Sequence, residues 1–143
     1  MSRIVSYRDL EAWQSAMDLL LRIYEIASQL PHVERFELAS QMRRAAVSVP
    51  SNIAEGQAYG PSARYLHHVR VALGSLAELD THLEAIIRIG HLTDQTLAPA
   101  FQLVRQTGRL LHGLERSLKL QQAAGWCLAL AGFLCAGTAL LLS

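Results

Sequence analysis

Arginine and polar side chains are concentrated in one stretch of the chain, residues 40–56, which reads SQMRRAAVSVPSNIAEG. Arg43 and Arg44 are adjacent there, and the planar guanidinium group of arginine binds phosphates and carboxylates through parallel hydrogen bonds. Three further basic side chains follow the predicted turn at 59–62, so this chemistry extends onto the next predicted helix. We interpret one set of residues as a candidate nucleic-acid surface: Arg43, Arg44, Arg64, His67 and Arg70.

A second interpretation of the same stretch is structural and depends on its proline. Pro50 removes one backbone donor from the predicted helix and frees a carbonyl one turn earlier. Hydroxyl and amide side chains can hydrogen-bond a disturbed backbone, and the candidates are Ser48, Ser51 and Asn52. Glu55 is expected to pair with an arginine on a neighbouring helix. The structural motif then comprises Pro50, Asn52, Glu55 and Gly56.

Patterns typical of catalysis or metal binding are missing from the sequence. It contains no Ser/His/Asp set, no HExxH motif, no phosphate loop and no dinucleotide fingerprint. His67 and His68 are adjacent, so on a helix their side chains point about 100° apart and do not readily share a ligand. The two cysteines, Cys127 and Cys135, lie in an apolar segment and are typical of packing residues. The sequence therefore predicts no enzymatic activity, no catalytic residue, no metal site and no cofactor.

Four amphipathic segments must position these side chains. Apolar residues recur at steps of three and four over residues 10–30, 34–58, 65–86 and 94–118, which is the period of an α-helix. The predicted buried stripe of the first segment is Leu10, Trp13, Met17, Leu20, Tyr24, Ala27 and Leu30. That of the third is Tyr65, Val69, Ala72, Leu76, Leu79, Leu83 and Ile86.

Turn and capping residues lie between these segments. Pro31 and Gly90 are expected to end two helices, and the capping candidates are Ser6 or Asp9, Pro61 or Ser62, and Thr93 or Asp94. Short connections favour antiparallel neighbours. The predicted fold class is therefore all-α, an antiparallel up-down-up-down four-helix bundle followed by an apolar C-terminal helical tail.

The charge distribution divides the chain into a bundle over 1–119 and a tail over 120–143. All 13 basic and 12 acidic residues lie in the bundle, and a balance of +1 excludes a polybasic arm as the main activity. Residues 123–142 can span a hydrocarbon core of about 30 Å, so a membrane anchor is one expectation. A helix buried against protein, a disordered soluble tail and a non-native extension are the alternatives. Residues 1–18 are too polar for a signal peptide, so we expect a cytoplasmic bundle, attached to the inner membrane if the tail is an anchor.

Three ordered motifs resemble one known family. The stretch at 40–56, the opening YRDLEAWQSA at 7–16 and the segment ALGSLAELDT at 72–81 are similar to the four-helix-bundle proteins encoded in 23S ribosomal RNA intervening sequences. The resemblance implies a bundle that commonly forms a ring-shaped homopentamer and has no known enzymatic activity. Related accessory proteins of diversity-generating retroelements imply binding of nucleic acid and a reverse transcriptase. This chain departs from the family pattern at 57–60, where a basic residue is often seen, and at His67 and His68.

Two functional hypotheses follow. The first is a non-enzymatic oligomeric scaffold or adaptor whose subunits meet through exposed apolar side chains. The candidates, each partly off the main stripes, are Leu21, Ile26, Val33, Phe36, Val71 and Ile87. The alternative is a nucleic-acid-binding accessory module in which the arginine surface, repeated around a ring, contacts RNA or DNA.

Overall fold

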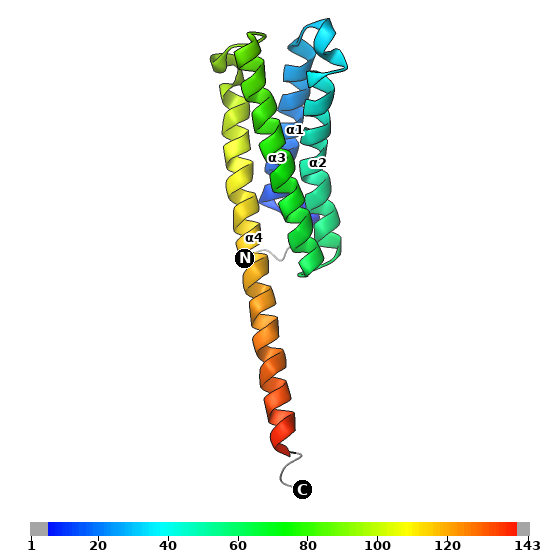
Figure 1. Ribbon diagram of the computed structural model, residues 1–143, viewed down its shortest axis with the longest axis vertical. Coiled ribbons are helices and arrows are strands. Elements are labelled where there is room, and N and C mark those ends of the chain that lie inside the picture. Colours follow the sequence, from blue (N-terminus) through cyan, green and yellow to red (C-terminus); the bar gives the residue numbers. More distant parts are fainter. Residues whose placement is uncertain (1–5, 140–143) are drawn as a thin grey trace.

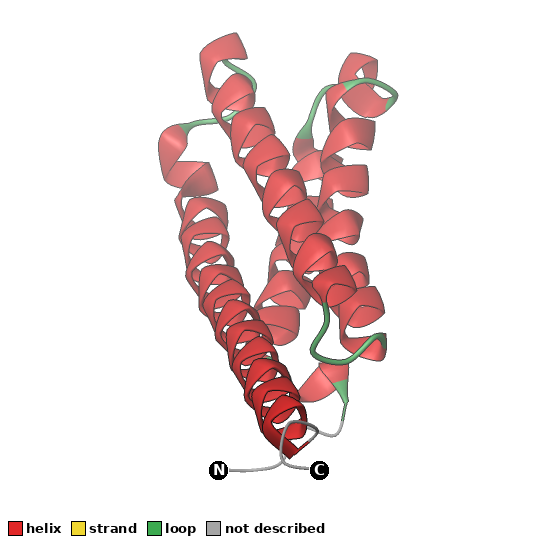
Figure 2. Ribbon diagram, turned by 60° about the horizontal axis from the view of Figure 1, so that its bottom comes forward, coloured by secondary structure: helices red, strands yellow, loops and turns green. Residues whose placement is uncertain are grey.

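The computed structural model describes residues 6–139, with side chains described up to residue 124. Four helices make up the bundle: α1 (Glu11–Gln29), α2 (Leu38–Ala58), α3 (Ala63–Ile89) and α4 (Asp94–Ala139). Two short 3₁₀ helices, η1 (Tyr7–Asp9) and η2 (His32–Arg35), precede α1 and α2. Figure 1 shows consecutive helices running up, down, up and down, and Figure 2 shows only helices and loops in the described chain. The all-α bundle prediction is confirmed.

Helix ends follow the capping residues closely. The hydroxyl of Ser62 accepts a hydrogen bond from the Tyr65 amide at the start of α3, and Thr93 does the same for Thr96 at the start of α4. Gly90 ends α3 with a left-handed φ of 86°, which favours glycine. Ser6, by contrast, caps η1 and not α1, because the 3₁₀ turn comes between them.

The predicted stripe of α3 is entirely buried, but that of α1 is wrong in its middle part. The α1 residues that enter the core are Ala12, Ser15, Ala16, Leu19, Ile23, Ile26 and Ala27. Trp13, Met17 and Leu20 are only half-buried, and Tyr24 is exposed. Helix α1 therefore carries two adjacent apolar stripes, and the bundle buries the one with smaller side chains. For the same reason Ile26, predicted to be exposed, is fully buried.

The α2 segment differs from its prediction at the start. Residues 32–35 form the separate helix η2, so α2 begins at Leu38 and not at Glu34. Pro50 lies inside an unbroken helix, with its ring buried. A proline costs a helix one backbone hydrogen bond, and here burial of the ring offsets part of that cost.

Helix α4 is 46 residues long and continues past the end of the other three helices (Figure 1). Its last described residue buried in the bundle is Leu118. Over the residues whose side chains are described, no helix is both long enough and apolar enough to cross a membrane. Side chains are described only up to residue 124, so nearly all of the predicted anchor at 123–142 lies outside that part of the chain.

Candidate functional site

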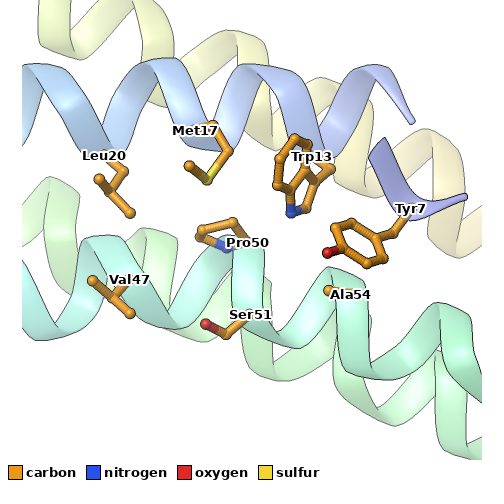
Figure 3. A pocket seen from close by; sticks show the side chains of 8 residues that line it. All are labelled: Tyr7, Trp13, Met17, Leu20, Val47, Pro50, Ser51 and Ala54. Carbon is orange, nitrogen blue, oxygen red and sulfur yellow. The ribbon is translucent and has the colours of Figure 1, made fainter. Parts of the chain in front are cut away.

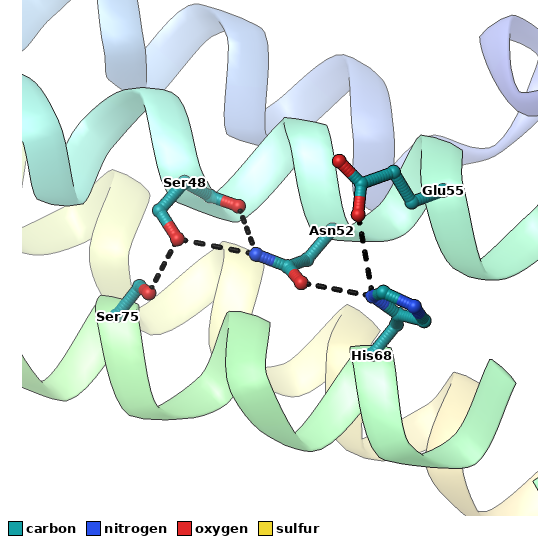
Figure 4. Close-up of polar contacts among 5 residues, drawn as sticks. All are labelled: Ser48, Asn52, Glu55, His68 and Ser75. Atoms are coloured by element: carbon teal, nitrogen blue, oxygen red, sulfur yellow. Dashed lines mark hydrogen bonds and ion pairs between the residues drawn. The ribbon is translucent and has the colours of Figure 1, made fainter. Parts of the chain in front are cut away.

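A chain of polar contacts joins α2 to α3 along the motif that contains Pro50 (Figure 4). The hydroxyls of Ser48 and Ser75 are 2.8 Å apart across the two helices. Asn52 Nδ2 donates to the Ser48 carbonyl at 2.9 Å and to its hydroxyl at 3.2 Å. Asn52 Oδ1 lies 3.0 Å from His68 Nδ1, and Glu55 Oε2 lies 3.6 Å from the same nitrogen. Polar side chains thus connect the two helices over several turns.

The direction of these hydrogen bonds defines the tautomer of His68. Because the Asn52 nitrogen already donates to Ser48, the Asn52 oxygen faces His68 and can only accept. Nδ1 of His68 is therefore the donor, and in the neutral ring Nε2 carries the lone pair.

One prediction for this motif needs correction. Glu55 pairs with His68 of α3 and not with an arginine, because the α3 side chain opposite it is the imidazole. Asn52 hydrogen-bonds the backbone, as predicted, at the Ser48 carbonyl.

Gly56 permits the close approach of α2 and α3 near their turn. A Cβ at this position would overlap Tyr65 Cδ2 and would lie 2.9 Å from Tyr65 Cε2 and 3.0 Å from His68 Cβ. The Tyr65 ring is buried, its hydroxyl has no hydrogen-bond partner among the described residues, and burial raises its pKa to about 12. The glycine of the motif thus has a packing role.

The five predicted nucleic-acid-binding residues do not form one patch. Arg64 and His67 lie in the first turns of α3, whereas Arg43 and Arg44 lie toward the opposite end of the bundle. The stretch of α2 from Arg43 to Ala58 alone rises by about 22 Å. Arg43 is placed over the ring of Tyr24, and Arg44 donates to Gln41. The predicted set therefore divides into two separate groups.

The fifth residue of that set, Arg70, belongs to an ion-pair cluster between α3 and α4. Its Nε lies 3.3 Å from Glu115, which also contacts Lys119 at 2.8 Å and His112 at 3.5 Å. The hydrogen bond from Lys119 is the main reason that the pKa of Glu115 falls to about 2, with Arg70 adding to it against the opposing effect of burial. Arg70 is thereby paired with a carboxylate of the same chain.

An apolar groove runs between α1 and α2 (Figure 3). Its volume is about 250 Å³, and it is lined by Tyr7, Trp13, Met17, Leu20, Val47, Pro50, Ser51 and Ala54. Figure 3 shows the α1 side chains on one side of the groove and the α2 side chains on the other. The stripe of larger side chains on α1, which the bundle only half-buries, forms one wall of this groove.

Comparison with known proteins connects this arrangement to a family. The profile described as 23S rRNA-intervening sequence protein matches residues 8–113. The chain belongs to the 23S rRNA-intervening sequence protein family. The match takes in most of η1, the helices α1 to α3, the polar network and most of the packed part of α4.

A solved structure shows the same fold. It is that of a protein of unknown function from the S23 ribosomal protein family of Bacteroides thetaiotaomicron, with 20% sequence identity and a TM-score of 0.68. The alignment covers 73% of this chain and 95% of the other. The comparison with curated proteins finds no match.

Tyr59 is a candidate site residue that the sequence interpretation passed over. In this 23S rRNA-intervening sequence protein it lies in the departure at 57–60, and 49% of it is exposed. Its ring stacks on His68 with centroids 5.6 Å apart and planes at 16°, and the Arg64 guanidinium lies 4.9 Å from its centroid. The sequence did contain a signal for this site, because Tyr59 is an aromatic residue shortly before a helix whose second residue is Arg64. In the described part of the chain, no three His, Cys, Asp or Glu side chains gather as a metal site does.

Proposed function

We propose that this protein is a non-enzymatic scaffold whose subunits associate through the groove between α1 and α2. The observation that carries the proposal is the second apolar stripe of α1, which lines the groove with Trp13, Met17 and Leu20 and is only half-buried by the described bundle. Leu21 and Val47 extend the same face outward, with 59% and 41% of their surfaces exposed. Exposed apolar faces of this kind are typical of association surfaces.

The occupant proposed for this groove is a second copy of the chain. A net charge of +1 gives little repulsion between copies. Full burial of a large apolar side chain contributes roughly 1.5–3 kcal/mol, against a cost of association of about 4–15 kcal/mol. Several side chains are therefore needed, and Trp13, Met17, Leu20 and Leu21 supply them from one helix. The homopentamer implied by the family resemblance would repeat this contact around a ring.

Leu21→Glu and Val47→Glu should convert the assembly into monomers, because each places a charge in the apolar contact. The measurement is the mass of the full chain by light scattering at micromolar concentration. Ile89→Glu is the matched control, since Ile89 is 57% exposed at the far end of α3 and should leave the mass unchanged. A wild-type monomer, or an assembly that survives both groove substitutions, would contradict the proposal.

The second candidate function is binding of single-stranded RNA or DNA at the α2–α3 turn. It is supported by the exposed Tyr59 ring, by Arg64 stacked beside it, and by the exposed His67. Bases stack on exposed aromatic rings, and arginine adds attraction to phosphate. Arg64 forms no ion pair with a carboxylate within the described chain, so its charge is free for a ligand.

Tyr59→Ala should weaken binding of a short single-stranded RNA by about tenfold, because stacking on one base contributes about 1–3 kcal/mol. Tyr59→Phe keeps the ring and should bind like the wild type. Fluorescence anisotropy at several salt concentrations measures both effects, and the affinity should fall steeply with salt. An RNA affinity that is equal in the Ala and Phe variants would remove this surface from consideration.

The membrane anchor predicted for the C-terminal tail is a separate proposal. The segment 123–142 contains no charged residue, and Arg116 and Lys119 precede it. We propose that it attaches a cytoplasmic bundle to the inner membrane, in the orientation that the basic residues before it favour.

A further inference from the structure

A recess with several basic side chains lies at the corner where α1 ends and α2 begins. It has a volume of about 390 Å³ and is lined by Ala27, Ser28, Leu30, His32, Arg35 and Arg43. Ala27 and Leu30 are buried and form an apolar floor, while the other four side chains contribute polar groups. The volume is within the range of small-molecule sites. The recess is distinct from the Tyr59 surface, which lies at the other end of α2.

The two arginines of this recess are held by aromatic rings and not by carboxylates. Arg35 lies 5.6 Å from the centroid of Phe36, and Arg43 lies 5.7 Å from that of Tyr24. Neither guanidinium pairs with a carboxylate in the described part of the chain. A ring face orients a guanidinium while leaving its N–H donors available.

The nearby carboxylates are turned to other partners or lie outside the lining. Glu34 pairs with His91 of the α3–α4 connection at 3.0 Å, and Glu25 pairs with Arg22 at 2.9 Å. Glu37 precedes α2 and does not line the recess. Two guanidinium groups therefore share one concavity without a resident anion, and a concave surface focuses their field.

We propose that this recess binds a small ligand through a phosphate group. Arg35 and Arg43 donate paired hydrogen bonds to the phosphate oxygens, as arginine does at phosphate sites in general. His32 adds a further donor at the rim, and the Ala27 and Leu30 floor accommodates an apolar part of the ligand. The hydroxyl of Ser28 donates to the Glu25 carbonyl at 2.6 Å, so it contributes no proton to the phosphate. The inference does not depend on self-association or on RNA binding at Tyr59.

Calorimetric titration of the full chain with inorganic pyrophosphate at low salt tests the proposal. We expect saturable binding that weakens at least tenfold in Arg35→Gln and in Arg43→Gln, since a charged hydrogen bond contributes about 1.5–3 kcal/mol. Arg44→Gln is the matched control, because Arg44 follows Arg43 directly, is exposed and does not line the recess. It removes the same charge and should bind pyrophosphate like the wild type. Thermal unfolding of each variant verifies that the fold is retained.

Three results would overturn the inference. The first is the absence of saturable binding by the wild-type chain. The second is an equal loss of affinity in Arg43→Gln and Arg44→Gln, which would indicate general surface electrostatics. The third is a single-stranded RNA that binds through Arg35 and Arg43 while pyrophosphate does not, which would assign the recess to a macromolecule.

Discussion

Replacing Gly56 with alanine should lower the free energy of unfolding by about 1–3 kcal/mol, the usual cost of overpacking a core. The added methyl group would overlap the buried ring of Tyr65 and press on His68 Cβ. The ring cannot move aside easily, because it is packed between α2 and α3. The loss should occur even though alanine is the better helix former by about 1 kcal/mol.

Gly74→Ala is the control that separates packing from helix propensity. Gly74 lies in the middle of α3, and a Cβ there meets nothing within 4 Å. This substitution should raise the free energy of unfolding by about 0.5–1 kcal/mol, since only the propensity changes. Urea unfolding followed by circular dichroism measures both. If the two alanines shift the urea midpoint in the same direction, the close approach at Gly56 has no energetic consequence.

Removing one partner of the Ser15–Thr107 pair should cost about 1–3 kcal/mol, whereas removing both should cost far less. The two hydroxyls are 2.8 Å apart and join α1 to α4 inside the core, where both residues are buried. Ser15→Ala or Thr107→Val leaves the other hydroxyl unpaired and away from water. The double variant leaves no unpaired group, so the desolvation penalty disappears.

A double-mutant cycle in urea measures this coupling, with all four proteins at one concentration because association changes apparent stability. Thr81→Val is the control, since Thr81 is an exposed residue of α3 whose hydroxyl bonds only the Ala77 carbonyl. It should change stability by less than about 0.5 kcal/mol. If the stability loss of the double variant equals the sum of the losses of the Ser15 and Thr107 single variants, the two hydroxyls do not act as a pair.

Local patterns predicted helix α3 well. The α3 stripe recurs at heptad spacing, and each of its seven predicted core residues is buried. Ser62 and Gly90 bound this helix because capping depends on a few neighbouring backbone groups. Such features need no information about the rest of the fold.

The same reasoning failed on α1 because that helix has two apolar stripes. Periodicity alone favoured the one with Trp13 and Met17, which have the larger side chains. Which stripe enters the core depends on how much space the facing helices leave, and α2 and α4 leave room for Ala16 and Ile23. The excluded stripe became the groove that the proposed association uses.

The candidate sites show the same division. By itself, the sequence determined the helical class, most helix ends, the inward face of α3 and the unusual composition of the motif around Pro50. Only the tertiary structure decided that His68 completes the polar network, that Tyr59 contacts both His68 and Arg64, and that Arg43 joins Arg35 and not Arg64. The physical reason is the distance over which the interactions act. Helix formation and capping depend on groups within about one turn, whereas these contacts depend on how the helices are packed against one another.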